Sequence, residues 1–529
     1  MYVFYDIKKM TTFHFFTSHR LFFLYNKEYD MNIIQGEVKM KLKDLTERQA
    51  GVLLPLFSIP SRHGIGDLGK EAYDFIDTSA KAGFSIWQML PMNPSSAGNS
   101  PYTPYSSFAG DEIYISLDLL TEWKLIDEVP SFHQDDSQVD YHAVRKFKEK
   151  YLRQAFATFK KDNSEFIEEY NTFVQGAFWL ESYARYMALK VANEGLSWVD
   201  WNDEDQDING SNEGLEDDIE YIKFLQYIFI KQFNLLKIHA HLVGISIMGD
   251  LPLYVGHDSA DVYEFRECFQ LDDKYDPLFI SGASPDYFSK DGQLWGHPLY
   301  NWDYLKETNY DFWVRRLKWN NEIFDILRVD HFRAFDTYWS VPYGEKTARN
   351  GKWIEGPSYD FLDSIYQQLP ELNMIVEDLG EIRPEVIELK DHYDLLGMRV
   401  MQFSFGWAEE QEGFKIPEHC VVYTGTHDNA TLKEWYEDLE DKKRIQDIMK
   451  TFKMNDETVY QQVLHHTLNC DAIIAIVPVQ DVLGYGKEAR INIPGTVGKQ
   501  NWSYKLTSLD DYKEHIDSIK QLLKETKRL

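Results

Sequence analysis

The sequence predicts an α/β protein whose core is a closed (β/α)8 barrel, or TIM barrel, with large helical and loop insertions and no C-terminal β-domain. Eight short apolar runs are typical of buried strands, and helical segments separate them, which favours a parallel sheet with right-handed crossovers. Eight strand–helix units are the number that closes such a sheet into a barrel. An open doubly wound sheet is the alternative, but no Gly-rich phosphate turn follows the first run.

The predicted strands are three to seven residues long. They are Gly51–Leu56, Phe84–Leu90, Ile245–Met248, Ile326–Val329, Met374–Val376, Met398–Phe403, Val421–Thr424 and Ile473–Val477. Short apolar runs of this kind are consistent with strands that are covered on both faces. We therefore expect the strands to form the inner wall of the molecule.

Two long gaps interrupt the alternation of strands and helices. More than 150 residues separate the second and third strands, and Tyr141–Phe159, Phe178–Val191 and Glu220–Ala240 have a strong helical period there. We predict a mainly helical insertion at about 105–240. A second insertion, at about 259–315, is rich in Asp, Gly, Pro and Tyr, which predicts a lid built from loops. A charged helix, Leu509–Leu529, follows the eighth strand.

Charge and cysteine content exclude several classes of function. A net charge of -31 repels the phosphates of nucleic acids and an anionic membrane surface, so neither is an expected partner. No apolar run approaches the roughly 20 residues that span a bilayer. The three cysteines, Cys268, Cys420 and Cys470, are far apart and provide neither a disulfide framework nor zinc-ligand spacing. This favours a reducing compartment, and we expect the protein to be cytoplasmic.

Residues Met1–Lys39 differ from the rest of the chain. They mix Phe, Tyr, Lys and His without helix or strand period, and they lack the apolar centre of a secretory signal. We expect this segment to be a non-native or disordered extension. Synthesis is expected to begin at Met40, because Gly36–Val38 can be encoded by triplets that contain a bacterial ribosome-binding sequence. Residues 40–529 would then form the barrel with its insertions.

Polar residues follow four of the predicted strands at the point where each strand ends. They are Asp250; Arg328, Asp330 and His331; Glu377 and Asp378; and His427 and Asp428. The carboxyl ends of the strands of a parallel barrel meet at one face, where the reaction sites of this fold lie. We therefore expect five carboxylates, two histidines and an arginine to converge there.

Each of these residues also has a simpler interpretation. Asp250, Asp378 and Asp428 could each cap a helix or anchor a loop by accepting backbone N–H bonds. Arg328 and Asp330 lie two residues apart on one strand face and could form only an ion pair. Independent caps need not recur at the same level of four strands, however. The recurrence favours a shared site.

Two kinds of chemistry suit such a cluster. Histidine and carboxylate groups bind zinc or manganese, but no HExxH spacing is present and no HxH pair lies at these strand ends, which weighs against a metal site. Glycoside cleavage with retention needs a carboxylate nucleophile and a carboxylic acid about 5–5.5 Å apart. The ends of neighbouring barrel strands supply such a separation.

Eight segments resemble the motifs of the 4-α-glucanotransferases, the amylomaltase or disproportionating-enzyme family (glycoside hydrolase family 77). They are Ser100–Tyr102, Gly249–Val255, Pro285–Ser289, Gly292–Gly296, Arg328–Phe332, Glu377–Gly380, Gly425–Asn429 and Val479–Gly484. The resemblance extends from about Arg48 to Tyr504 and keeps the order of the family's motifs. It implies an α-amylase-like barrel without the usual C-terminal β-domain. We expect that no metal or organic cofactor is needed, because an acid pair can perform both half-reactions and no ligand spacing is visible.

The resemblance also implies residue roles. Asp330 would be the nucleophile, Glu377 the general acid and base, and Asp428 the group that holds the sugar hydroxyls in the transition state. Arg328 would keep Asp330 ionised through its positive charge. The substrate-binding residues that the resemblance implies are Tyr102, Asp250, Asp286, Gln293, Trp295, Arg328, His331, Asp378 and His427.

The activity so implied is transfer of α-1,4-glucan segments. A donor maltooligosaccharide would pass a segment to the 4-hydroxyl of an acceptor sugar and release glucose or short maltooligosaccharides. An α-1,4-glucan hydrolase is the enzymatic alternative, and a non-catalytic glucan-binding protein is the other. Val255 stands where α-amylases usually place a histidine, five residues after Asp250, and all three catalytic acids are present. Both observations favour the transferase.

Overall fold

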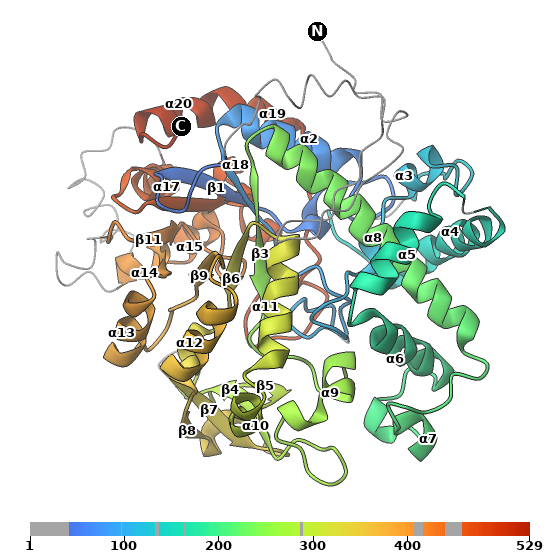
Figure 1. Cartoon of the computed structure of the whole chain (residues 1–529). Helices are drawn as coiled ribbons and strands as arrows, with labels where there is room; N and C mark the ends of the chain where they lie inside the picture. The colour runs from blue at the N-terminus through green and yellow to red at the C-terminus, as the bar shows by residue number, and fades with distance from the viewer. Residues whose placement is uncertain are drawn as a thin grey trace.

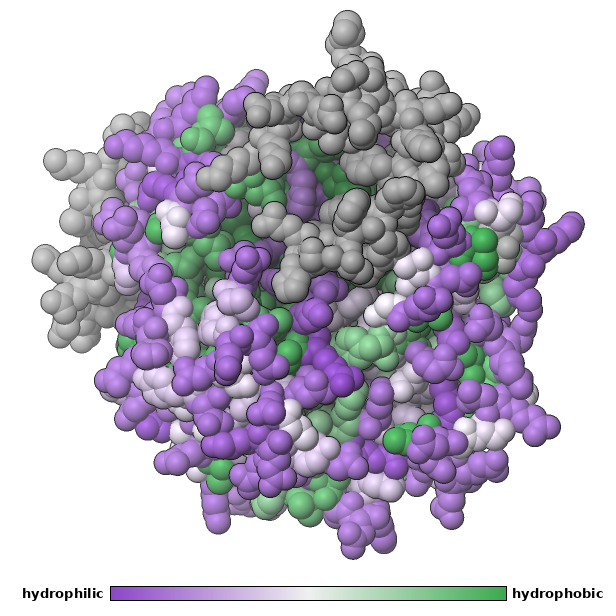
Figure 2. Space-filling view, in the orientation of Figure 1, coloured by the Kyte–Doolittle hydropathy of each residue, from purple (hydrophilic) through white to green (hydrophobic). Residues whose placement is uncertain are grey.

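The computed structural model describes residues 42–96, 98–132, 137–162, 164–285, 289–406, 416–439 and 458–529. Figure 1 shows strands at the centre of the molecule with helices around them. The expected extension Met1–Lys39 and the expected start at Met40 lie outside the described residues. In the part that is described, no helix combines the length and the apolar composition that crossing a bilayer requires. The face in Figure 2 is mostly hydrophilic.

Eight parallel strands close into a barrel, which confirms the predicted fold class. They are β1 (Gln49–Leu53), β2 (Ile86–Gln88), β3 (Ser246–Leu251), β6 (Ile326–Val329), β9 (Met374–Val376), β10 (Leu396–Val400), β11 (Cys420–Tyr423) and β12 (Ile474–Pro478). Their order around the barrel follows the chain, and β12 pairs with β1 to close the ring. Nearly all their residues are buried, because helices cover the outside and side chains fill the inside.

Helices surround the barrel. They include α2 (Lys70–Ala82), α11 (Asp311–Ile323), α12 (Ser358–Gln368), α13 (Pro384–His392), α15 (Leu432–Asp438) and α17 (Val459–Asn469). In α2 the residues Ala72, Phe75, Ile76 and Ala82 are buried, a spacing that places them on one helical face. The helix ends at Gly83, whose φ of 100° suits glycine. Helical period and a C-terminal glycine thus explain why this segment forms a helix.

The gap between β2 and β3 holds the helices that the sequence predicts there. They are α3 (Leu117–Glu122), α4 (Tyr141–Lys161), α5 (Ile167–Gly176), α6 (Leu180–Ala192), α7 (Asp203–Gln206) and α8 (Glu216–Leu242). At the start of α4, the Asp140 side chain accepts a hydrogen bond from the backbone N–H of Ala143, as N-caps do. Helix α8 packs against both α6 and β3, so it joins the insertion to the barrel.

The second insertion holds strands where the sequence predicts only loops. β4 (Phe279–Ala283) and β5 (Gln293–Pro298) join β7 (Thr337–Pro342) and β8 (Lys352–Glu355) in an antiparallel sheet of order β5-β4-β7-β8. Short helices α9 (Ala260–Glu264) and α10 (Trp302–Glu307) flank β4 and β5 in the chain. The sequence signal is weak because Gly282 and Gly296 interrupt the strands and every residue of β8 is exposed. This corrects the expectation of a loop-built lid.

Two smaller predictions are also corrected. The sixth predicted strand runs to Phe403, but β10 ends at Val400 and α14 (Met401–Gly406) begins directly after it. An apolar run this short fits a strand or one turn of a buried helix equally well. The predicted terminal helix is two helices, α19 (Asp510–Glu514) and α20 (Ile516–Glu525), which meet at His515.

Two arginines hold the seam where β12 meets β1. Arg528, which follows α20, is fully buried and donates hydrogen bonds to the backbone oxygens of Gln49 (2.9 Å) and Ile473 (3.1 Å). Arg48 donates to the backbone oxygens of Ala472 (3.1 Å) and Cys470 (2.8 Å). Bonds from a charged donor are stronger than those between neutral groups. The segment after α20 therefore joins β1 to β12 through hydrogen bonds.

Candidate active site

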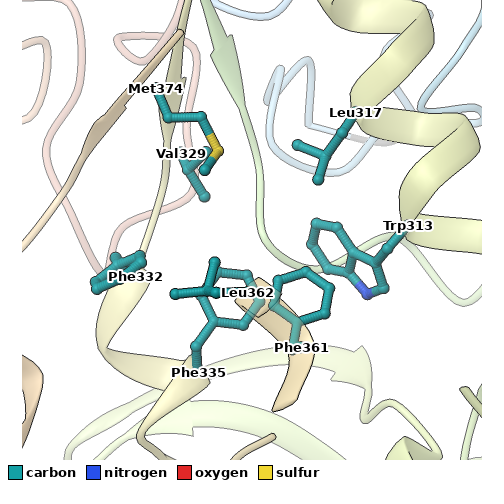
Figure 3. Close-up of a pocket in the computed structure, with 8 residues that line it drawn as sticks. All are labelled: Trp313, Leu317, Val329, Phe332, Phe335, Phe361, Leu362 and Met374. Atoms are coloured by element: carbon teal, nitrogen blue, oxygen red, sulfur yellow. The ribbon is translucent and has the colours of Figure 1, made fainter. Parts of the chain in front are cut away.

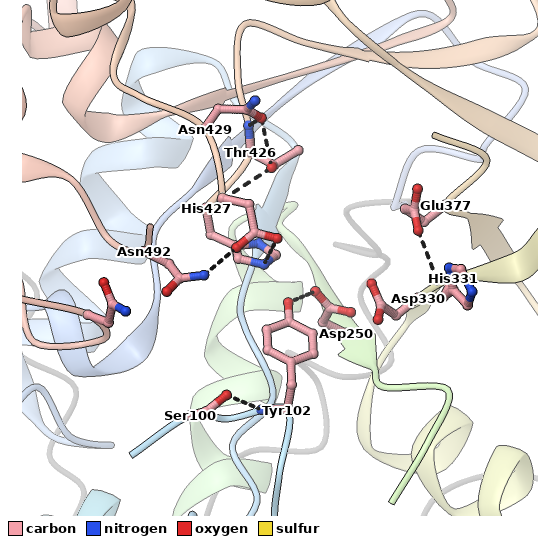
Figure 4. Close-up of polar contacts among 12 residues, drawn as sticks. Ser100, Tyr102, Asp250, Asp330, His331, Glu377, Thr426, His427, Asn429 and Asn492 are labelled. Atoms are coloured by element: carbon pink, nitrogen blue, oxygen red, sulfur yellow. Dashed lines mark hydrogen bonds and ion pairs between the residues drawn. The ribbon is translucent and has the colours of Figure 1, made fainter. Parts of the chain in front are cut away.

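The pairing register of β6 and β9 places the acids that follow these strands at the same height along the barrel axis. The two strands pair in parallel with Val329 opposite Val376. The residues that follow, Asp330 and Glu377, therefore lie side by side at the carboxyl end of the barrel. Figure 4 shows both carboxyl groups on the same side of the site. The convergence expected from the sequence is present for this pair.

Arg328 links two of the carboxylates. It lies opposite Asp250 in the β3–β6 pair, and its Nη1 donates to Asp250 Oδ1 at 2.6 Å. Its Nη2 lies 3.0 Å from Asp330 Oδ1. Burial lowers the pKa of Arg328, but the two carboxylates outweigh this and hold its pKa well above its ordinary value. A permanently charged guanidinium thus stands beside Asp330.

An apolar layer outside the barrel fixes the strand that carries Asp330. Side chains alternate along a strand, so Val329 points outward while Arg328 and Asp330 point into the barrel. Figure 3 shows the pocket around Val329. It is lined by Trp313, Leu317, Val329, Phe332, Phe335, Phe361, Leu362 and Met374. Since this lining is wholly apolar, the pocket belongs to the packing between β6, β9 and their helices and supports the site from behind.

Glu377 is held by two backbone amides. Its Oε2 accepts a hydrogen bond from the N–H of His331 at 2.9 Å, and its Oε1 accepts one from Leu379 at 2.7 Å. Burial and the charge of Asp330 raise its pKa to about 7, against the opposing effects of Arg328 and the two amides. Near neutral pH this carboxyl can therefore exchange a proton.

His331 adopts a backbone conformation that is uncommon outside glycine, with φ of 48°. This turn directs its N–H at Glu377 and its ring at Trp295, with ring centroids 4.8 Å apart. Burial lowers the pKa of His331 to about 4, so the ring is neutral at pH 7. Among the residues that the structure describes, its buried Nε2 has no hydrogen-bond partner.

Asp428 reaches the site from the loop after β11. Its Oδ2 lies 3.3 Å from His427 Nε2, and its Oδ1 accepts a hydrogen bond from the Asn492 side chain at 2.6 Å. Desolvation raises the pKa of Asp428, but His427 and Asn492 outweigh it and lower the pKa to about 2. The Asp428 side chain is nevertheless 46% exposed, so a ligand can reach it. Sequence reasoning misses Asn492, which follows no strand end.

Tyr102 spans two of these groups. Its O–H donates to Asp250 Oδ2 at 2.8 Å, and its ring stacks on His427 with centroids 5.2 Å apart. Figure 4 shows Tyr102 between Asp250 and His427. The structure therefore places Tyr102, Asp250 and His427 together, as the sequence predicts.

The second sheet brings residues to the site from outside the barrel. Trp295 Nε1 donates to Gln293 Oε1 at 3.2 Å, and both residues lie on β5. His297, two residues further along β5, is half-buried, and its Nε2 lies 3.1 Å from Thr103 Oγ1. Sequence reasoning misses His297, although the alternation of a strand that starts at Gln293 would have indicated it. The predicted residue Asp286 lies outside the described residues.

Asp378 is turned toward the barrel wall. Its Oδ1 accepts a hydrogen bond from the backbone N–H of Met398 at 2.6 Å, and its Oδ2 lies 3.4 Å from Arg399 Nη1. A Cβ atom at Gly397 would lie 2.4 Å from Asp378 Oδ2, so glycine is required there. These contacts match the simpler interpretation of Asp378 as an anchor, and its contact with substrate stays a prediction.

The electrostatics of the site favour acid–base and nucleophilic chemistry. Glu377 and Asp428 have pKa values of about 7 and about 2, a separation that assigns different roles to two carboxyl groups. In the described ranges no group of three or more His, Cys, Asp or Glu side chains is arranged to hold a metal ion. The site therefore presents a proton-exchanging acid beside a carboxylate that is paired with an arginine.

Comparisons with known proteins agree on one family. A family model described as 4-alpha-glucanotransferase matches residues 54–510. A 4-alpha-glucanotransferase from Aquifex aeolicus is 40% identical over 490 residues, which cover 90% of this chain and 98% of that protein. One from Clostridium butyricum is 39% identical over 462 residues, which cover 85% and 94%. The solved amylomaltase from Streptococcus agalactiae in complex with acarbose is 33% identical, with a TM-score of 0.87, covering 91% of this chain and 100% of that one.

Proposed function

Because the chain belongs to the 4-alpha-glucanotransferase family, we propose that it transfers α-1,4-glucan segments by retaining double displacement with Asp330, Glu377 and Asp428. The observation that carries this proposal is that Asp330 and Glu377 follow paired residues at the ends of neighbouring strands. Retaining glycoside cleavage requires such a pair of carboxyl groups. The donor is a maltooligosaccharide or another α-1,4-glucan, and the acceptor is a sugar with a free 4-hydroxyl.

In the first half-reaction, Asp330 attacks the anomeric carbon of the donor. A new ester bond forms between that carbon and Asp330 as the glycosidic bond breaks. Glu377 gives its proton to the leaving oxygen, which departs as a hydroxyl of glucose or of a short maltooligosaccharide. Arg328 supports this step because its Nη2, 3.0 Å from Asp330 Oδ1, holds the nucleophile in place.

In the second half-reaction, Glu377 works as a base. Once Asp330 is esterified, it no longer carries the negative charge that helps to raise the pKa of Glu377. The pKa of Glu377 then falls, so the ionised carboxylate can accept the proton of the incoming hydroxyl. That hydroxyl attacks the anomeric carbon, the ester bond breaks, and Asp330 is regenerated. The charge on Asp330 thus sets the direction of proton transfer.

The neighbouring residues hold the sugar at the cleavage point. Asp428 is low in pKa and half exposed, so it offers an ionised acceptor for two sugar hydroxyls. The Nε2 of neutral His331, which has no hydrogen-bond partner within the described part of the chain, suits a further hydroxyl. Trp295 and Gln293 approach from the second sheet and would cover the bound chain, which favours a sugar acceptor over water.

The product ladder from pure maltotriose over time tests the proposal. Transfer converts maltotriose into longer oligomers together with glucose, whereas hydrolysis gives only shorter sugars. The expected result is a ladder that extends above the starting length. Glucose and maltose without longer products would support the α-1,4-glucan hydrolase, and an unchanged substrate would support a non-catalytic glucan-binding protein.

We also propose a cytoplasmic location. The support is that Cys268, Cys420 and Cys470 are all free, which suits a reducing compartment. Fractionation of the native host tests this, and recovery of the activity outside the cytoplasmic fraction would contradict it.

A further inference from the structure

Tyr102, His427 and Trp502 form a cluster of three aromatic rings at the site. The ring of Trp502 lies 5.7 Å from that of Tyr102 and 5.8 Å from that of His427, while Tyr102 and His427 stack at 5.2 Å. Trp502 is only 7% exposed. Ring pairs at these separations attract one another and fix their mutual orientation. Each ring in the cluster is therefore held by the other two.

Two members of the cluster connect directly to the carboxylates of the site. Tyr102 donates its O–H to Asp250, and His427 contacts Asp428 through Nε2. A rotation of either ring would move its polar atom away from the carboxylate. The position of Trp502 therefore bears on both contacts.

Trp502 is held in place from elsewhere in the chain. Its backbone N–H donates to the oxygen of Ile491 at 2.7 Å, and its backbone oxygen accepts from the Tyr141 hydroxyl at 2.7 Å. Tyr141 begins α4, so the helical insertion anchors the cluster. The backbone φ of Trp502 is 60°, which is unfavourable for so bulky a residue. Strain of this kind persists only where the surrounding structure enforces it, and it is concentrated at functional sites.

We propose that Trp502 is a positioning residue of the glucanotransferase reaction, which holds His427 against Asp428 and Tyr102 against Asp250. The inference rests on the proposed function, because it assigns Asp428 to the transition state. Trp502 acts through the other two rings and contributes its flat surface. An apolar side chain of similar bulk without a ring would fill the space but leave His427 and Tyr102 free to rotate.

Two substitutions at Trp502 distinguish the effect of an aromatic ring from the effect of apolar volume. Trp502→Phe keeps an aromatic face, and Trp502→Leu keeps an apolar side chain without one. We expect Trp502→Leu to lower kcat on maltotriose roughly tenfold to a hundredfold, the range for a small misplacement of catalytic groups, with little change in KM. Trp502→Phe should retain most of the kcat. A Trp502→Leu enzyme with the kcat of the wild type, or one that changes only in KM, overturns the proposal.

Trp201→Leu is the matched control. Trp201 is 4% exposed and packs on Tyr186 and Tyr263, away from the site. Its loss should lower the unfolding temperature as much as the loss of Trp502 but leave kcat unchanged. A fall in kcat equal to that of Trp502→Leu would show that loss of packing alone explains the effect.

The acidic limb of the pH profile provides a second readout. The charged groups that face His427 are Asp428, Arg328 and Asp250. If the His427–Asp428 contact loosens, the pKa of Asp428 rises from about 2 toward its ordinary value. The acidic limb of kcat/KM then moves to higher pH in Trp502→Leu but not in Trp502→Phe. An unmoved limb contradicts the positioning role, while a wild type that leaves maltotriose unchanged would instead refute the proposed function.

Discussion

The carboxyl end of the barrel and the four-stranded sheet meet at the same site but are built differently. The barrel strands are buried, and each acid on them is fixed by register and by a charged or amide partner. The sheet β5-β4-β7-β8 ends in an exposed strand, and it reaches the site through Trp295 and its neighbours on β5. We propose from this difference that the barrel performs the bond chemistry and that the sheet controls which acceptor completes it.

The largest expected effect comes from the two barrel acids. Asp330→Asn should abolish turnover, because the amide cannot form the ester. Glu377→Gln should lower kcat by about 10²–10⁴-fold, the usual contribution of a general acid. Steady-state assays on maltotriose measure both. A mechanism-based glucosyl fluoride should label Asp330 in the wild type, and labelling of Asp250 or Asp428 instead would refute the assignment.

The next effect is the dependence of the barrel chemistry on pH. Glu377 must be protonated when it acts as an acid, and its pKa is about 7. Thus kcat/KM should fall above about pH 7, because the protonated fraction of Glu377 declines. The fall should approach tenfold for each further pH unit. Removal of the neighbouring charge in Asp330→Asn should lower the pKa of Glu377, which infrared titration of the carboxyl group can detect. A Glu377 that titrates near its ordinary value in the wild type would contradict this mechanism.

A glycine in each region tests how tightly the two regions are packed. Gly397→Ala places a Cβ atom 2.4 Å from Asp378 Oδ2 and should destabilise the fold by about 1–3 kcal/mol, with reduced activity. Gly351→Ala, directly before β8 of the sheet, places one 2.2 Å from Trp339 Nε1 and should cost similar stability but spare kcat. Chemical denaturation and rate assays on both variants make the comparison. Equal loss of kcat in the two would show that the sheet also holds the catalytic groups.

A smaller effect is expected where the sheet meets the bound sugar. Trp295→Ala should weaken substrate binding and raise the ratio of hydrolysis to transfer severalfold, because the shortened side chain admits water. New reducing ends measure hydrolysis, and the redistribution of chain lengths measures transfer. The two assays together give the ratio. If the overall rate falls while the ratio stays fixed, Trp295 contributes binding alone.

The smallest expected effect is that of metal removal. Exhaustive chelation should leave the rate unchanged, because the acid pair can perform both half-reactions without a cation. Activity lost to a chelator and restored by calcium or zinc would contradict this.

The sequence predicts the barrel well for a physical reason. Strands covered on both faces are continuous apolar runs, and their carboxyl ends must meet, so Asp330 and Glu377 can be placed together from the order of residues alone. In the second sheet, β4 and β5 contain glycine and β8 is exposed, so these three strands lack a clear period and escape prediction. Asn492 and Trp502 escape it because they lie outside the strands and helices, and only tertiary packing brings them to the site.

The seam between β1 and β12 also constrains the order of events during synthesis. β1 pairs with a strand more than 400 residues later in the chain, and Arg528 latches the pair only after α20 has been made. Contacts this distant in sequence form slowly, and they form last on a ribosome that releases the amino-terminal end first. Until then, one edge of β1 stays unpaired, and an unpaired edge invites pairing with another nascent chain. The barrel can therefore close only after β12 has been synthesised.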